Sequence, residues 1–211
     1  MKKLMIAVMM LTMASSALAS LVQTAEPIEV GQINGAVLLS KGMGDATEDF
    51  MTISARATYG AIENLLVSLE LGYTLVDVDG ADNQIPITVA VQYSLPVDWP
   101  VDVAVRGELG IGDMGEASDT MSIMPAAVVS WNCTMVEWLA LYAGLGYWLP
   151  LGDMGDFMDG GLAIAFGGDI DLASVAENLG MVVEINAVDI GVEGVDMFDS
   201  LNFVIGATYA F

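Results

Sequence analysis

Apolar and polar side chains alternate along most of this chain. In the clearest segment, residues 51–60, odd-numbered positions are apolar or aromatic, and even-numbered positions are small, polar or charged. Neighbouring side chains of a β-strand point to opposite faces, so a period of two predicts a strand with one apolar and one polar face. A helical period of 3.6 residues fits none of the alternating segments. The pattern therefore predicts an all-β protein.

The alternation predicts about ten strands, and ten fits the pattern better than eight or twelve. They lie near residues 32–41, 51–60, 65–75, 85–95, 101–111, 121–131, 139–147, 162–170, 181–192 and 201–211. The first of these segments is the least regular. In the ninth, the apolar positions change phase after Ala187, which predicts a β-bulge near that residue.

The composition decides where the apolar faces point. Hydrophobic residues make up 55% of the chain, yet after the first twenty residues no apolar run resembles a membrane-spanning helix. Alternating strands are how a transmembrane β-barrel distributes such hydrophobicity. The opposite faces are mostly Gly, Ala, Ser and Thr, which would make a poor soluble surface and argue against a lipocalin-like barrel. We therefore predict an antiparallel up-and-down transmembrane β-barrel.

The last segment carries the most specific pattern. Its outward positions are apolar or aromatic and end at the final residue: Leu201, Phe203, Ile205, Ala207, Tyr209 and Phe211. In this the chain resembles bacterial outer-membrane β-barrel proteins, whose final strand alternates in the same way and ends in an aromatic residue. The resemblance implies a place in the bacterial outer membrane among its lipid and lipopolysaccharide. It also implies that the barrel-assembly machinery recognises Tyr209 and Phe211.

The first nineteen residues have the features of a signal peptide. Lys2 and Lys3 precede an apolar run, and Ala17-Leu18-Ala19 matches the small-x-small cleavage pattern. We expect residues 1–19 to be removed and residues 20–211 to form one barrel domain. The remaining chain has three basic residues against 28 acids, a formal net charge of −25. Such a charge repels nucleic acid, so we expect no nucleic-acid partner.

The connections between the ten segments fall into two kinds. Every odd connection contains three acids; these are residues 42–49, 77–84, 113–120, 153–160 and 193–200. The even connections, such as Ala61 to Asn64, carry one or two acids and are mostly shorter. An even strand number places both termini on one side, which is periplasmic in this class. We therefore expect five short acidic loops outside the cell.

Five charged residues lie on the polar faces and are candidates for a cluster inside the barrel: Arg56, Glu70, Arg106, Glu108 and Glu184. A charge facing lipid at mid-strand would cost roughly 2–4 kcal/mol, so these side chains should point inward. In an antiparallel strand pair, the residue numbers of facing partners add up to a constant. For the two strands joined by the short connection at 61–64 this sum is near 126, which sets Arg56 opposite Glu70. We therefore predict an Arg56–Glu70 ion pair, with Arg106 and Glu108 on the same wall.

The cluster has two interpretations. Ion pairs could fill a narrow barrel, or the charges could form a constriction that selects solutes, with the acids favouring cations. Eight strands are just filled by side chains and sixteen leave a channel, so ten strands favour the filled barrel. The small inward residues of the seventh and eighth segments leave space, unless Tyr142 and Trp148 occupy it.

Catalysis has little support in the sequence. The chain has no histidine, which removes Ser-His and Cys-His pairs and histidine metal sites. The barrel enzymes of the class that the chain resembles depend on a histidine. Cys133 is the lone cysteine, so no intramolecular disulfide is expected.

We therefore expect a non-enzymatic small outer-membrane barrel, porin-like or structural, with no cofactor. One alternative is a surface adhesin or a loop protein that binds cations. Residues 77–83 have oxygen ligands spaced as in a calcium loop but lack the later bidentate acid, so an ordinary acidic loop is the simpler interpretation. A second alternative, a barrel enzyme, would need a catalytic group that the sequence does not supply. Small ions or solutes are further candidate partners.

Overall fold

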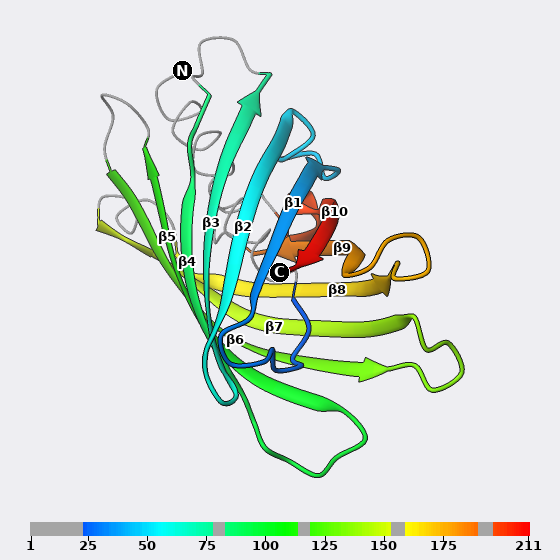
Figure 1. Cartoon of the computed structure of the whole chain (residues 1–211). Helices are drawn as coiled ribbons and strands as arrows, with labels where there is room; N and C mark the ends of the chain where they lie inside the picture. Colours follow the sequence, from blue (N-terminus) through cyan, green and yellow to red (C-terminus); the bar gives the residue numbers. More distant parts are fainter. Residues whose placement is uncertain (1–22, 78–82, 114–118, 153–158, 190–195) are drawn as a thin grey trace, which may run out of the picture.

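The computed structural model describes residues 23–77, 83–113, 119–152, 159–189 and 196–211. Ten antiparallel strands form one closed barrel, in which each strand pairs with its sequence neighbours and β1 pairs with β10 (Figure 1). The predicted all-β, ten-stranded, up-and-down barrel is therefore confirmed. The expected signal peptide at 1–19 and the centres of four acidic connections lie outside the described residues.

The strands follow the sequence pattern closely. Their bounds are β1 Ile33–Gly42, β2 Phe50–Ile62, β3 Leu65–Val76, β4 Ile87–Ser94, β5 Asp102–Asp113, β6 Asp119–Asn132, β7 Leu139–Leu151, β8 Gly161–Asp171, β9 Leu179–Val188 and β10 Asn202–Ala210. A 3₁₀ helix, η3, covers Met197–Ser200 before β10. In the described part of the chain, no helix is both long and apolar enough to cross a membrane.

The fourth strand begins later than predicted. Residues 85–95 alternate in sequence, but β4 starts at Ile87, and Gln84 forms only an isolated bridge with Thr74. Pro86 lies between them and has no N–H to donate, so it interrupts the ladder. Its carbonyl still accepts a bond from the Gly72 N–H at 2.9 Å.

The bulge predicted near Ala187 is wrong. The register of β9 is unbroken against β8 as far as Val188 and against β10 as far as Asn186, and the strand ends at Val188. Ala187 and Val188 are both buried because the end of β9 packs against η3. The Ser200 hydroxyl accepts the Val188 N–H at 3.0 Å and donates to the Val188 carbonyl. The shift of the apolar positions after Ala187 therefore marks the end of β9, where η3 packs against the strand.

A register shift does occur in β2, at its end beside β3. The pairing passes from Gly60–Leu66 to Ile62–Leu65, so Ala61 is the extra residue. The turn that follows has Asn64 at φ 63°, a left-handed conformation that Asn tolerates better than most residues. This turn fixes the register of the two strands.

Burial in this barrel is inverted relative to a soluble protein. Polar side chains such as Thr52, Gln92 and Ser130 are buried inside, whereas apolar ones such as Ile53 and Leu145 are exposed outside. Exposed Tyr and Trp residues lie toward the strand ends, with Tyr59, Tyr93, Trp131, Trp138 and Tyr209 at one end and Tyr73 and Tyr147 at the other, whereas the exposed Phe166 lies in the middle of β8. An apolar belt between aromatic girdles is the surface that lipid requires.

Candidate functional site

The interior contains the ion pair that the strand pairing predicts. Arg56 and Glu70 are register partners on β2 and β3. The Arg56 Nη2 lies 2.7 Å from the Glu70 Oε2, and the Arg56 Nε donates to the same oxygen at 2.8 Å. Both residues are at most 6% exposed. Their charges therefore neutralise each other in a place that solvent barely reaches.

A second ion pair lies on the inner face of β5. The Arg106 Nε is 2.5 Å from the Glu108 Oε1, and both residues are buried. The Arg106 Nη1 also donates to the Gln92 Oε1 on β4 at 3.4 Å, because Gln92 and Arg106 are register partners. Arg56 interacts electrostatically with Glu108 and Glu184 as well. The structure thus gathers all five predicted charges into one electrostatic cluster.

The fifth member, Glu184, is held by neutral donors. The Tyr142 hydroxyl donates to its Oε2 at 2.9 Å, and the Asn186 Nδ2 donates to its Oε1 at 2.7 Å. Glu184 is 1% exposed. Counting each residue in its ordinary charge state, two arginines face three glutamates in the cluster, so its formal charge is −1. Sequence reasoning had placed Glu184 inside but did not identify these two partners.

Bulky side chains occupy the space that the small residues of β7 and β8 leave. Trp148 is fully buried, and the Tyr142 ring lies over Gly167. A Cβ on Gly167 would stand 2.3 Å from the Tyr142 Cζ and hydroxyl, so only glycine fits beneath the ring. The small-residue wall therefore accommodates two large aromatic side chains and adds little free lumen.

The N-terminal segment also enters the barrel, which no sequence pattern indicated. We call residues 23–31 the strap; in Figure 1 it is the dark-blue stretch that precedes β1. Ala25 is completely buried, and its N–H donates to the Ser130 Oγ at 3.1 Å. The side chains that bind Gln23, Thr24 and Ala25 lie 45 to 105 residues away in sequence. No local periodicity can report contacts at such separations.

A turn leads from the strap into β1. The Gln32 N–H donates to the Glu29 carbonyl at 3.1 Å, and Gly31 takes φ 88°, a conformation that glycine adopts easily. The Gly31 N–H donates to the Gly60 carbonyl at 2.8 Å. A Cβ on Gly60 would lie 2.1 Å from the Glu29 carbonyl oxygen, so this glycine lets the turn sit close to β2.

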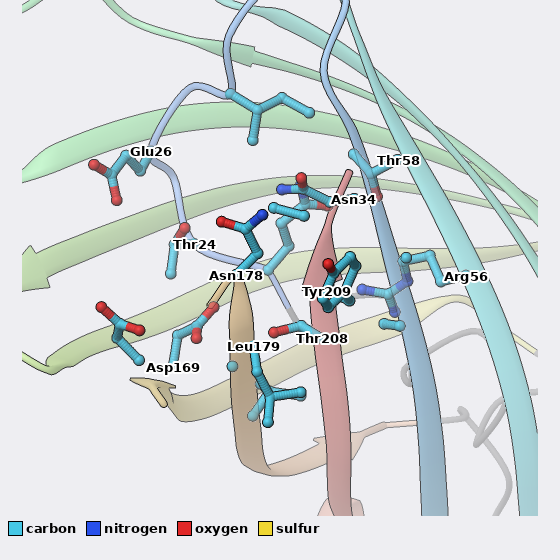
Figure 2. A pocket seen from close by; sticks show the side chains of 18 residues that line it. Thr24, Glu26, Asn34, Arg56, Thr58, Asp169, Asn178, Leu179, Thr208 and Tyr209 are labelled. Carbon is cyan, nitrogen blue, oxygen red and sulfur yellow. The ribbon is translucent and has the colours of Figure 1, made fainter. Parts of the chain in front are cut away.

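The strap borders two cavities. The first, of about 280 Å³, lies between the strap and the wall of β8, β9, β10, β1 and β2. Figure 2 shows Arg56 on one side of this cavity and Glu26 and Asp169 on the other. The second, of about 550 Å³, extends to the β6–β7 turn. Thr24, Glu26, Asp169 and Asp171 line both, so the two spaces are neighbours at one end of the barrel and the strap borders each of them.

Glu26 is the acid of the strap at this mouth. Although the side chain stays partly exposed, partial burial raises the pKa of its carboxyl above the usual value. Asp102 raises this pKa further by repulsion, and a hydrogen bond with Asn132 lowers it. In the parts of the chain that the structure covers, no group of three or more acidic or cysteine side chains is arranged to hold a metal ion.

The C-terminal residues close the seam of the barrel. The Phe211 N–H donates to the Ile33 carbonyl at 2.9 Å, where β10 pairs with β1. The rings of Tyr209 and Phe211 contact edge to face with centroids 4.9 Å apart. Phe211 is largely exposed, so its ring remains accessible to a partner.

Comparison with known proteins identifies the fold. No protein-family model matches the chain, and a search of curated protein sequences found no match. Among solved structures, the chain is similar to the KdgM porin in complex with disordered oligogalacturonate, at 9% identity and a TM-score of 0.52, over 85% of this chain and 99% of that one. The KdgM porin in a second structure gives 10% identity and a TM-score of 0.51, again over 85% and 99%. An outer membrane channel from Pseudomonas putida F1 gives 10% identity and a TM-score of 0.50, over 89% and 98%. At such identities the likeness concerns the fold.

Proposed function

We propose that this bacterial outer-membrane β-barrel protein is a structural membrane barrel whose lumen is closed. The observation that carries the proposal is the burial of the interior charges: Arg56, Glu70, Arg106, Glu108 and Glu184 are each at most 6% exposed. In a water-filled channel such side chains would be hydrated. The side-chain cluster fills the middle of the barrel, and the strap occupies its mouth.

A second candidate function is a small cation-conducting channel that opens when the strap leaves. The two cavities beside the strap, of about 280 and 550 Å³, support this candidate because the strap borders both of them. Glu26, Asp169 and Asp171 line both, and such acids would favour cations over anions. Adhesion or cation binding by the acidic loops remains a separate proposal, because six of their fifteen acids lie outside the described residues.

The role that we propose is not enzymatic. The chain has no histidine, and its buried glutamates Glu70, Glu108 and Glu184 are engaged with arginine, tyrosine and asparagine side chains. We further expect the exposed apolar belt to contact outer-membrane lipid and lipopolysaccharide. The exposed Phe211 would be the contact for the barrel-assembly machinery.

Single-channel recording in a planar lipid bilayer tests the closed lumen. We expect the purified protein to insert without stable current steps, because the five charged side chains of the cluster are buried away from solvent. The Arg56→Ala/Glu70→Ala double variant serves as the comparison, since it removes the two charges of one ion pair and the bulk of both side chains. Stable, cation-selective steps from the unaltered protein would overturn the structural proposal in favour of the channel.

A further inference from the structure

We propose that the inner wall of β3–β6 is a binding groove for an extended peptide with a small central side chain, and that the strap is its resident, displaceable ligand. The inference rests on the closed lumen proposed above. It adds that the strap closes the mouth of the barrel and that hydrogen bonds to the inner wall hold the strap there. The groove residues are Ser68 on β3, Gln92 and Ser94 on β4, Ala104 and Arg106 on β5, and Val128 and Ser130 on β6.

The groove binds the main chain of the strap. The Gln92 Nε2 donates to the Thr24 carbonyl at 2.9 Å, and the Ser94 Oγ donates to the Ala25 carbonyl at 2.7 Å. The Ala25 N–H donates in turn to the Ser130 Oγ at 3.1 Å. Two carbonyls and one N–H of consecutive residues are thus paired by side chains from two strands. Recognition of this kind fits an extended backbone of any sequence.

The central side chain is selected by size. Ala25, Ala104 and Val128 form a small apolar cluster, and all three are 0% exposed. The Ala25 methyl group packs in one cluster with the other two side chains. A larger side chain at this position would collide with two strands that the closed barrel holds in place.

The groove also binds one polar side chain of the strap, that of Gln23. The Gln23 Oε1 accepts from the Arg106 Nη1 at 3.1 Å and from the Ser68 Oγ at 3.5 Å. Arg106 therefore links the strap to the interior ion pair with Glu108. The ligand that the groove fits is an extended peptide with an acceptor side chain two residues before a small residue.

The strap is held more weakly than a strand. It forms no ladder with the wall, and Val30 near its end is 62% exposed. The cavities of about 280 and 550 Å³ both border it and share four lining residues. Displacement of the strap would join these two spaces into one vestibule and would leave the groove free for a second peptide.

The test uses the folded full-length protein and a synthetic, fluorescent peptide of the sequence Gln23–Val30. An Ala25→Trp variant should expel the strap and empty the groove, whereas the matched Val30→Trp variant changes an exposed position and should leave the groove occupied. We expect the peptide to bind the Ala25→Trp barrel at least about tenfold more tightly than the Val30→Trp barrel. A peptide that carries Ala25→Trp should also bind at least about tenfold more weakly than the native peptide.

Equal binding to both barrels, or no binding to a folded Ala25→Trp barrel, would overturn the proposal. Folding is checked by the shift that heating causes in gel migration. If Ala25→Trp fails to fold, thiol labelling of Ala25→Cys in a Cys133→Ser chain replaces it. Adding Ser94→Ala should then speed labelling about tenfold, because the docked strap loses a buried hydrogen bond. An unchanged rate contradicts the groove. Neither readout depends on bilayer conductance, so failure of the closed-lumen proposal is separately visible.

Discussion

Arg56 and Glu70 show how a local rule can specify an interior contact. The two-residue turn after Ile62 sets the β2–β3 register, and that register places both side chains on the inner face opposite each other. Their atoms are 2.7 Å apart in an interior that solvent barely reaches, so each buried charge is stabilised mainly by its partner. Removal of one partner would leave a buried charge without compensation, which costs more than removal of the pair.

A double-mutant cycle measures this dependence. We expect Arg56→Ala and Glu70→Ala each to lower the free energy of unfolding by about 3 kcal/mol, and the double variant to lose less than the sum. Urea unfolding of the barrel in lipid vesicles provides the measurement, with the exposed Lys41→Ala as control. In a wide, wet lumen screening would reduce the coupling to roughly 0–1 kcal/mol. A coupling near zero would therefore contradict the filled interior.

Gly167 is a second residue whose identity is set by packing inside the barrel. An added Cβ would stand 2.3 Å from the Tyr142 ring and hydroxyl, so Gly167→Ala should push Tyr142 away from Glu184. We expect a loss of about 1–3 kcal/mol in unfolding free energy, the usual cost of overpacking. Gly107→Ala is the matched control because its Cβ would meet nothing within 4 Å. Equal midpoints of urea unfolding for both variants would refute the tight packing.

At the scale of elements, β10 closes the barrel and ends in the aromatic pair. Its ladder to β1 runs from Gly42–Asn202 to Asn34–Ala210, and the Phe211 N–H continues it to Ile33. Gly35 lies under the Phe211 ring, where a Cβ would be 3.2 Å from the Cε2. The last residue thus contributes both to the seam and to an exposed apolar surface.

Deletion of Phe211 should lower the amount of folded barrel in the outer membrane. The class that the chain resembles presents such a terminal aromatic to its assembly machinery, and the deletion also removes one hydrogen bond of the seam. Phe211→Tyr, which keeps a ring and the terminal N–H, should assemble nearly as well as the unaltered chain. Heat-modifiable migration of membrane fractions on gels quantifies the folded form. Unchanged assembly of the deletion variant would show that the resemblance misleads at this position.

At the scale of the whole molecule, the direction of the barrel decides which side the strap faces. The strap meets β2 at Gly60, beside the β2–β3 turn, so the strap and this turn occupy the same end. With the even connections in the periplasm, the strap would close the periplasmic mouth. The acidic connections at the opposite end would then face the outside of the cell.

Tag insertion tests this direction. A protease site or epitope at Gly80 or Gly155 should be accessible on intact cells, because both positions belong to odd, acidic connections. The same tag at Glu63, in the β2–β3 turn, should be reached only after the outer membrane is permeabilised. The opposite pattern would invert the barrel and would place the strap at the outer mouth.

The strand number, the faces of the strands and the Arg56–Glu70 pair can all be predicted from the amino-acid sequence alone. Each follows from a short-range rule: side chains alternate every residue, and a short turn fixes the register of the strands that it joins. The inward direction of the five charges also followed, because lipid cannot solvate them.

The way in which the lumen is filled becomes visible only in the folded barrel. Ala25 meets Ser130 across 105 residues of sequence, and Tyr142 reaches Glu184 only because the curved wall carries a glycine beneath its ring. The phase change at Ala187 predicted a bulge, but η3 covers that strand end instead. Such contacts join distant segments, and they exist only after the barrel has closed; the alternation of side chains along a strand carries no information about them.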